Sequence, residues 1–217
     1  MTFNIEQARH AMIEQQVRPW NVVDMHVLET MKIIPRELFV ADAYKNLAFS
    51  DTSLPIGQDQ WMLKPVIEGR LLQALNVQAN DEVLVIGTGS GFLTACLAHM
   101  ARAVTSIDTH ADFIETAKAK MLSLELNNVQ FEQADIFNFQ SNRQFDAIAV
   151  TGAVSEIPEN IKQLLLPNGR LFIMHGQSPV QEAVCITRVG ESFHYESLFE
   201  TDVPYLSGAE QKPQFSL

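Results

Sequence analysis

The sequence has little cysteine and no long apolar run. Only two of its 217 residues are cysteines, Cys96 and Cys185, and each stands in an apolar segment. Two buried free thiols and a reducing, cytoplasmic location are therefore expected rather than a disulfide. No apolar run approaches the roughly 18 residues that a transmembrane helix needs. The first ten residues lack the cationic start and apolar stretch of a signal peptide, so none is expected.

Basic residues are also scarce, because 15 Lys and Arg face 26 Asp and Glu, a formal net charge of −11 at pH 7. Proteins that follow a nucleic-acid backbone or an anionic membrane surface need basic side chains, so neither partner is expected. The 6 histidines show no metal-ligand spacing, and no metal site is predicted. Repeats and linkers are absent, and a chain of this length and 47% hydrophobic content suits one globular domain.

Residues 1–79 form the first part of the chain, which we expect to be a helical cap and a loop. Helical spacing of apolar residues predicts three helices, over 5–17, from Asp24 to Pro35 and from Pro65 to Leu75. Arg18-Pro19-Trp20 is expected to end the first helix, because proline disfavours helix at the residue before it. Asp24 is a suitable cap for the second helix. Residues 46–64 show neither period and are predicted to form a long loop.

After residue 80, apolar strands alternate with amphipathic helices. Strands are predicted over 82–86, 103–108, 129–135, 145–151 and 169–175, with helices over 92–100, 111–124 and 157–166 and a turn at 167–169. Strands over 183–189 and 193–199 then form a hairpin. This order predicts an α/β, doubly wound, mainly parallel sheet with an antiparallel C-terminal edge. We expect one domain over 1–217, with its core at 80–200 and a partly ordered surface tail at 201–217.

The strongest chemical signal is the loop Gly87-Thr88-Gly89-Ser90-Gly91, which joins the first parallel strand to a helix. Glycines let the backbone turn sharply and approach a ligand, and the helix N-terminus adds unpaired N–H groups. A dinucleotide site needs Gly-x-Gly-x-x-Gly, but Phe92 stands where its last glycine would be. Gly-x-Gly-x-Gly is instead the pattern of methyltransferases that use S-adenosyl-L-methionine (SAM).

Three further signals follow the ends of successive strands. Asp108 ends the second strand, where a carboxylate accepts both hydroxyls of a ribose. Ala134 and Asp135 end the third strand, where the adenine edge is expected, and Thr151 ends the fourth, facing the transferred methyl group. Each signal alone is equally compatible with a turn or a helix cap. Because all lie at one edge of the sheet, they predict a SAM site together with the glycine loop, and no catalytic residue is assigned.

The sequence resembles the protein-L-isoaspartate O-methyltransferases over residues 6–175. The matching segments are Ile34–Val40, Leu54–Gly57 with Gln60 and Pro65, the glycine loop, Phe145–Ile148 with Thr151, Ile157-Pro158 and Leu166–Leu171. The resemblance implies a Rossmann-like fold, SAM as cofactor, and isoaspartyl carboxylates of damaged polypeptides as methyl acceptors. It also places the active-site serine of that family at Leu63, whose side chain neither donates nor accepts a hydrogen bond.

The choice of acceptor follows from these residues only in part. A carboxylate is already ionised at neutral pH, since a model Asp has a pKa near about 3.9, so its methylation needs no general base. The loop before Pro65, however, is made more apolar by Trp61, Met62 and Leu63. These side chains are compatible with a small apolar or aromatic acceptor, and equally with packing of the loop against the sheet. A SAM-binding module without turnover is a further alternative, whereas Phe92 disfavours NAD-dependent oxidoreduction.

Overall fold

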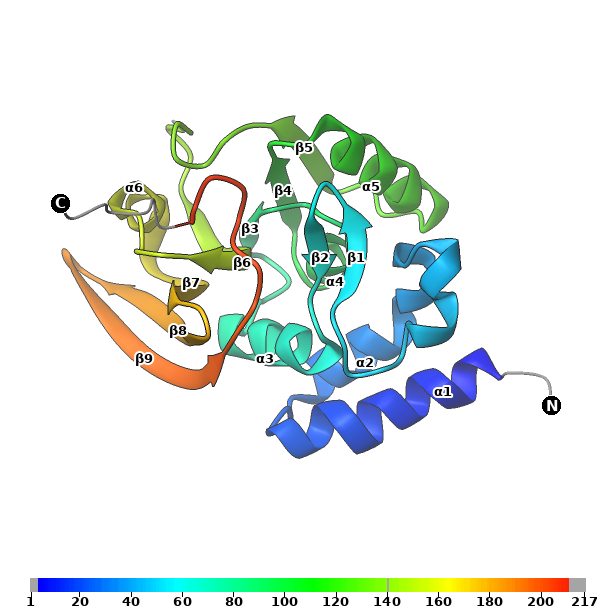
Figure 1. Cartoon of the computed structure of the whole chain (residues 1–217). Coiled ribbons are helices and arrows are strands. Elements are labelled where there is room, and N and C mark those ends of the chain that lie inside the picture. Colours follow the sequence, from blue (N-terminus) through cyan, green and yellow to red (C-terminus); the bar gives the residue numbers. More distant parts are fainter. Residues whose placement is uncertain (1–3, 140, 211–217) are drawn as a thin grey trace, which may run out of the picture.

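The computed structural model describes residues 4–139 and 141–210. Its centre is a seven-stranded sheet in the order β5-β4-β3-β6-β7-β8-β9, shown in Figure 1. The strands are β3 (Glu82–Ile86), β4 (Ala103–Asp108), β5 (Val129–Gln133), β6 (Phe145–Val154), β7 (Leu165–Gln177), β8 (Val180–Val189) and β9 (Ser192–Thr201). The first five strands in this order, from β5 across to β7, run parallel to one another. Strand β8 then pairs antiparallel with β7, and β9 pairs antiparallel with β8. The predicted fold class is confirmed.

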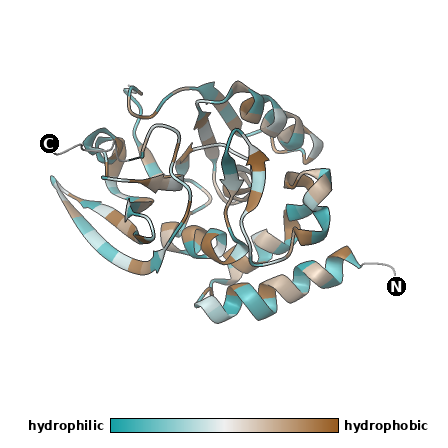
Figure 2. Ribbon diagram, in the orientation of Figure 1, coloured by the Kyte–Doolittle hydropathy of each residue, from teal (hydrophilic) through white to brown (hydrophobic). Residues whose placement is uncertain are grey.

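Both faces of the parallel part are covered, which explains why its strands are apolar throughout. Along β3, Val83 and Val85 enter one hydrophobic cluster, and Leu84 and Ile86 enter the other. The first cluster packs under α3 (Pro65–Leu75), α4 (Phe92–Met100) and α5 (Ala111–Ser123), and the second under α6 (Glu159–Gln163) and loops. The edge strand β9 is mostly exposed and largely hydrophilic in Figure 2, as suits a strand with one open edge.

The N-terminal helices are as predicted except for one boundary. Helix α1 (Ile5–Met12) continues as a π-helix to Val17 and a 3₁₀ turn over Arg18–Trp20. The predicted end at Arg18 is therefore wrong by one turn, because Pro19 lies at the start of the 3₁₀ turn, where its missing N–H breaks no bond. Asp24 caps α2 (Met25–Ile33) by accepting from the N–H groups of His26 and Val27, as predicted.

The prediction that residues 46–64 are a long loop is wrong in part. This stretch contains a hairpin of β1 (Leu54–Gly57) and β2 (Gln60–Met62), which lies in front of the main sheet in Figure 1. The turn residues Gln58 and Asp59 both have positive φ, at 53° and 52°, as a two-residue hairpin turn requires. Strands of four and three residues are too short to show a period of two, so the sequence carried no signal for them.

Smaller differences concern the second half of the chain. The predicted helix over 157–166 is present only as α6, and the predicted turn at 167–169 lies inside β7. There the register with β6 shifts and Asn168 has a φ of 65°, so the strand accommodates the turn as an irregularity.

Residues 202–210, the described part of the predicted tail, form an ordered strap across the end of β6. The Ala153 N–H donates to the Pro204 carbonyl at 3.0 Å, and the Leu206 N–H donates to the Ala153 carbonyl at 2.9 Å. The side-chain amide of Gln181 anchors Val203, because its Nε2 donates to the Val203 carbonyl and its Oε1 accepts from the Val203 N–H. Figure 1 shows the strap in red beside β6. Residues 211–217 of the predicted tail lie outside the described residues.

The first and third helical segments of the N-terminal cap make a close contact. A Cβ on Gly69 of α3 would lie 2.7 Å from Val17 Cγ1 and 3.3 Å from Val22 Cγ2. Val17 and Val22 belong to the same hydrophobic cluster as Val83 and Val85 of β3. The cap and the sheet therefore share one hydrophobic cluster.

We predict that Gly69→Ala destabilises the protein by roughly 1–3 kcal/mol through overpacking against Val17. In an unconstrained helix the same change stabilises by about 1 kcal/mol, so the sign of the effect reports the contact. Urea unfolding of the wild type, Gly69→Ala, Val17→Ala and Val17→Ala/Gly69→Ala measures it. The double variant should lose less unfolding free energy than the sum of the losses in the two single variants, because Val17→Ala makes room for the new methyl group. A higher unfolding free energy for Gly69→Ala alone would refute the packing argument.

Candidate functional site

A cavity lies at the carboxyl ends of the parallel strands. It encloses about 650 Å³, counting its open mouth, and five segments meet around it: the β1–β2 hairpin, the glycine loop, and residues 107–113, 134–136 and 204–207, with Thr151 and Gly152. A smaller pocket adjoins it and shares six of its lining residues, Ile56, Trp61, Leu63, Gly87, Gly89 and Thr151. The topology therefore collects distant segments at one edge of the sheet, where ligands bind in open α/β folds.

The glycine loop is held close to β6. The N–H groups of Gly87 and Thr88 donate to the Ile107 carbonyl at 2.9 and 3.1 Å. Thr151 Oγ1 donates to the Gly87 carbonyl at 2.7 Å. Gly87 has a φ of 87°, and a Cβ there would lie 2.4 Å from Thr151 Oγ1. Only glycine fits this position, and the result is a stretch of bare backbone facing the cavity.

Asp108 holds two loops in place at once. Its Oδ2 accepts from the Gly89 N–H and its Oδ1 from the His110 N–H, both at 2.9 Å. His110 is the N-cap residue of α5, so Asp108 also supports the start of that helix. The two predicted roles, ligand contact and cap, are compatible, because each carboxylate oxygen keeps a second lone pair for a ligand. Asp108 is buried and yet lines the cavity.

Asp135 orders the next strand end in a similar way. Its Oδ1 accepts from the Phe137 N–H at 2.9 Å and its Oδ2 from Asn138 Nδ2 at 2.8 Å. The Ala134 N–H donates to the Asp108 carbonyl at 2.9 Å, which joins the ends of β4 and β5. Both Ala134 and Asp135 line the cavity.

The structure brings together most of the residues that the sequence singled out. Lining the large cavity are Gly87, Gly89, Asp108, Ala134, Asp135 and Thr151, whereas Thr88 and Ser90 line only the smaller pocket. Gly91 lines neither. It starts α4 with a φ of 88°, and a Cβ there would lie 3.0 Å from Ala117 Cβ, so its role is packing.

Several lining residues had no signal in the sequence. Phe113, Leu206 and Ser207 line the cavity from α5 and from the strap. Ser207 Oγ lies 3.0 Å from His110 Nε2, so a hydrogen bond ties the strap to the start of α5. These residues are 97 positions apart in the sequence, and no local pattern could have paired them.

A buried ion pair lies behind the smaller pocket. Arg36 donates to Glu68 Oε2 and to the carbonyls of Ala48 and Leu63, the latter two at 2.8 Å. Arg36 also lies over the ring of Phe92, 5.1 Å from its centroid. Glu68 is 1% exposed and lines the smaller pocket. Burial raises the pKa of Glu68 to about 7, and Arg36 offsets this only in part. Glu68 stands in a helix among apolar residues, and no pattern in the sequence marks it as part of a site.

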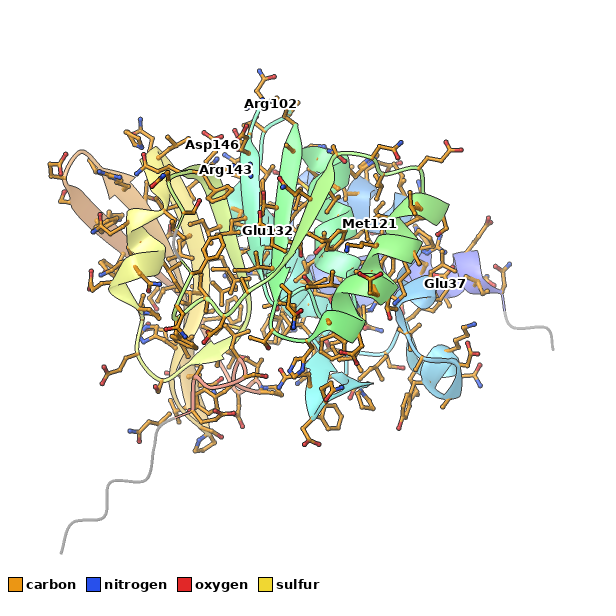
Figure 3. All side chains as sticks on the ribbon, turned by 90° about the horizontal axis from the view of Figure 1, so that it is seen from above. Glu37, Arg102, Met121, Glu132, Arg143 and Asp146 are labelled. Atoms are coloured by element: carbon orange, nitrogen blue, oxygen red, sulfur yellow. The ribbon has the colours of Figure 1, made fainter. Side chains whose placement is uncertain are left out.

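The opposite, amino-terminal edge of the sheet carries charged side chains. Arg102, Arg143 and Asp146 lie at this end in Figure 3. Glu82 pairs with Arg102 at 2.7 Å and with Arg143 at 3.7 Å, and the Asp146 carboxylate accepts from the Glu82 N–H at 2.8 Å. Asp146 thus anchors backbone as Asp108 does, but at the far edge of the sheet from the cavity.

The part of the chain that the structure describes contains neither a cluster of metal-binding side chains nor a helix that could cross a membrane. In residues 4–139 and 141–210, His, Cys, Asp and Glu side chains form no group of three or more that could hold a metal ion. In these same ranges, every helix is too short or too polar to cross a membrane.

Comparisons with known proteins place the chain in a family. Residues 7–208 match the model of the family described as protein-L-isoaspartate(D-aspartate) O-methyltransferase (PCMT). The chain is 36% identical over 187 residues to a Proteus mirabilis protein-L-isoaspartate O-methyltransferase, covering 85% of this chain and 89% of the relative. It is 38% identical over 192 residues to the enzyme of that name from Pseudoalteromonas atlantica, covering 86% and 90%.

A solved structure shares the fold. It is a Plasmodium falciparum protein described as a protein-L-isoaspartate O-methyltransferase, in complex with S-adenosyl-L-homocysteine. Its TM-score is 0.79 at 21% identity, and the match covers 94% of this chain and 99% of that one. The family model spans nearly the whole chain, and the residues that line the cavity fall within it. The chain therefore belongs to the protein-L-isoaspartate(D-aspartate) O-methyltransferase family.

Proposed function

We propose that this protein transfers the methyl group of SAM to the side-chain carboxylate of isoaspartyl residues in polypeptides. The observation that carries the proposal is the convergence of the glycine loop, Asp108, Ala134 and Asp135 on one cavity, in a chain of this family. Two free buried cysteines, Cys96 and Cys185, further favour a reducing, cytoplasmic location.

The residues present fit SAM. The cavity is lined by apolar side chains and by a few polar groups from several segments, as small-molecule sites are. Gly87 leaves bare backbone for a close approach, and Asp108 would accept from the ribose hydroxyls with its remaining lone pairs. Ala134 and Asp135 would meet the adenine. When bound, SAM supplies an electrophilic methyl group on a sulfonium.

The protein's own contribution is positioning. An isoaspartyl carboxylate is ionised at neutral pH, so no side chain has to remove a proton. Aligning the acceptor oxygen with the methyl group is worth up to about 7–11 kcal/mol of the barrier. Ile56, Trp61 and Leu63 of the hairpin region and Leu206 of the strap cover the cavity with apolar groups, which would exclude water from the reaction.

A different acceptor is the second candidate, and Leu63 favours it. The Leu63 side chain is buried, and its carbonyl is already occupied by Arg36. Leu63 therefore offers an acceptor only apolar contact, which would suit a small apolar or aromatic molecule. Purified protein that binds SAM but leaves isoaspartyl peptides unmethylated would support this candidate, or a binding module without turnover.

We predict that the protein forms a base-labile methyl ester on an isoaspartyl peptide and not on the matching aspartyl peptide. The measurement is transfer of a radiolabelled methyl group from SAM, followed by release as methanol at alkaline pH. Peptides of identical sequence, differing only in the isoaspartyl linkage, provide the matched control. Equal labelling of both peptides, or of neither, would contradict the proposed acceptor.

We also predict that Asp108→Asn weakens binding of S-adenosylhomocysteine roughly 10- to 100-fold, because hydrogen bonds to a charged group are lost. Isothermal calorimetry gives the affinity. Asp146→Asn is the matched control, since Asp146 also accepts from a backbone N–H but lies at the other edge of the sheet. The control should bind as the wild type does. Unchanged affinity in a folded Asp108→Asn variant would remove Asp108 from the site.

A further inference from the structure

The two adjoining pockets differ in the ionisable residues that line them. In the large cavity the ionisable lining residues are Asp108, which ends β4, His110, which follows it, and Asp135, which follows β5. In the smaller pocket the one ionisable residue among the described lining residues is Glu68. Gly87, Gly89 and Thr151 line both pockets, so the two pockets adjoin along the glycine loop and the end of the fourth parallel strand.

The proposed binding mode sets the direction of that ligand. If the ribose lies at Asp108 and the adenine at Ala134 and Asp135, the nucleoside fills the large cavity. The amino-acid portion of SAM then extends past Gly87 and Gly89 into the smaller pocket, toward Glu68. This portion ends in an α-ammonium group, which carries a positive charge and three N–H donors and needs acceptors when it leaves water.

Glu68 is placed to serve as that acceptor. It projects from the first turn of α3, and its side chain is 2% exposed. Arg36 donates to Oε2, so Oε1 has capacity for another donor. Arg36 itself is occupied by the carbonyls of Ala48 and Leu63, which fixes the pair in place. The other residues around the smaller pocket are apolar or uncharged, for example Met62 and Leu93. A charge-assisted hydrogen bond in such surroundings is strong.

We propose that Glu68 is a cofactor-binding residue that pairs with the α-ammonium group of SAM; the assignment rests on the SAM site proposed above. Glu68 would thereby anchor the amino-acid end while Asp108 anchors the nucleoside end. The sulfonium between these two anchors is held opposite the acceptor. Neither the family match nor the sequence pattern assigns this residue.

Binding of the ammonium group should change the protonation of Glu68. The groups that face Glu68 are Arg36 from the 3₁₀ turn Arg36–Phe39 and Cys96 from α4; burial holds the pKa of the Cys96 thiol well above its usual range, so the thiol is neutral. The pKa of Glu68 is about 7 without ligand. An ammonium group favours the ionised carboxylate and lowers this pKa, so binding releases a proton near pH 7. Affinity should then rise with pH.

The experiment compares two ligands by calorimetry at pH 6 and pH 8. S-adenosylhomocysteine carries the α-ammonium but no sulfonium charge, whereas 5′-methylthioadenosine has the same nucleoside and sulfur but no amino-acid portion. With a Glu68 pKa of about 7, wild-type protein should bind S-adenosylhomocysteine about tenfold more tightly at pH 8 than at pH 6. Binding at pH 7 should release protons into the buffer. Methylthioadenosine should show neither effect, and it also reports any pH dependence that arises at the nucleoside end.

Variants complete the test. At pH 8, Glu68→Gln should bind S-adenosylhomocysteine roughly 10- to 100-fold more weakly, lose the pH dependence, and bind methylthioadenosine within about twofold of wild type, which shows that the pocket is folded. Glu37→Gln is the matched control, because Glu37 also forms an ion pair, with Arg9 at 2.5 Å, but lines neither pocket. Equal affinity of wild type and Glu68→Gln, or pH dependence for both ligands alike, would overturn the assignment of Glu68. Failure of wild type to bind either ligand would instead overturn the proposed SAM site.

Discussion

The buried pair of Arg36 and Glu68 is the constraint on which the ligand-binding half of the molecule depends. Two charges removed from water must stay together, because an unpaired one costs roughly 3–5 kcal/mol. Arg36 also donates to the carbonyls of Ala48 and Leu63. One side chain thus joins the chain before the β1–β2 hairpin, the chain after it, and helix α3. The hairpin is held against the glycine loop as a result.

The cofactor end of the site is organised by a second principle. Parallel strands deliver their carboxyl ends to one edge, and the carboxylates there are fixed by local donors: Asp108 by the Gly89 and His110 N–H groups, and Asp135 by Phe137 and Asn138. Side chains held in this way need no reorganisation when a ligand arrives. The carboxylate of Asp108 is thus held in place before a ligand binds, with lone pairs left to accept from it.

The acceptor side is built differently, from segments outside the α/β core. The hairpin region precedes the core in the sequence and contributes Ile56, Trp61 and Leu63. The strap follows the core and contributes Leu206 and Ser207. In the proposed binding mode, the core provides the nucleoside contacts, and the flanking segments line the approach to the methyl group. The glycine loop, which belongs to the core, therefore identifies the cofactor. The identity of the methyl acceptor depends instead on the side chains around Leu63.

The sequence by itself determined the parallel sheet, the glycine loop and the position of Asp108, because each leaves a local pattern: continuous apolar strands, three glycines at fixed spacing, and an acid at a strand end. Only the tertiary structure decided the hairpin over Leu54–Met62, the strap over 202–210 and the importance of Glu68. Strands of three and four residues have no readable period, and a strap with Pro204 depends on hydrogen bonds to β6. Glu68 stands among the apolar residues of a helix, and its partner Arg36 is 32 residues away. Contacts between such distant positions are set by how the elements pack, which no local pattern records.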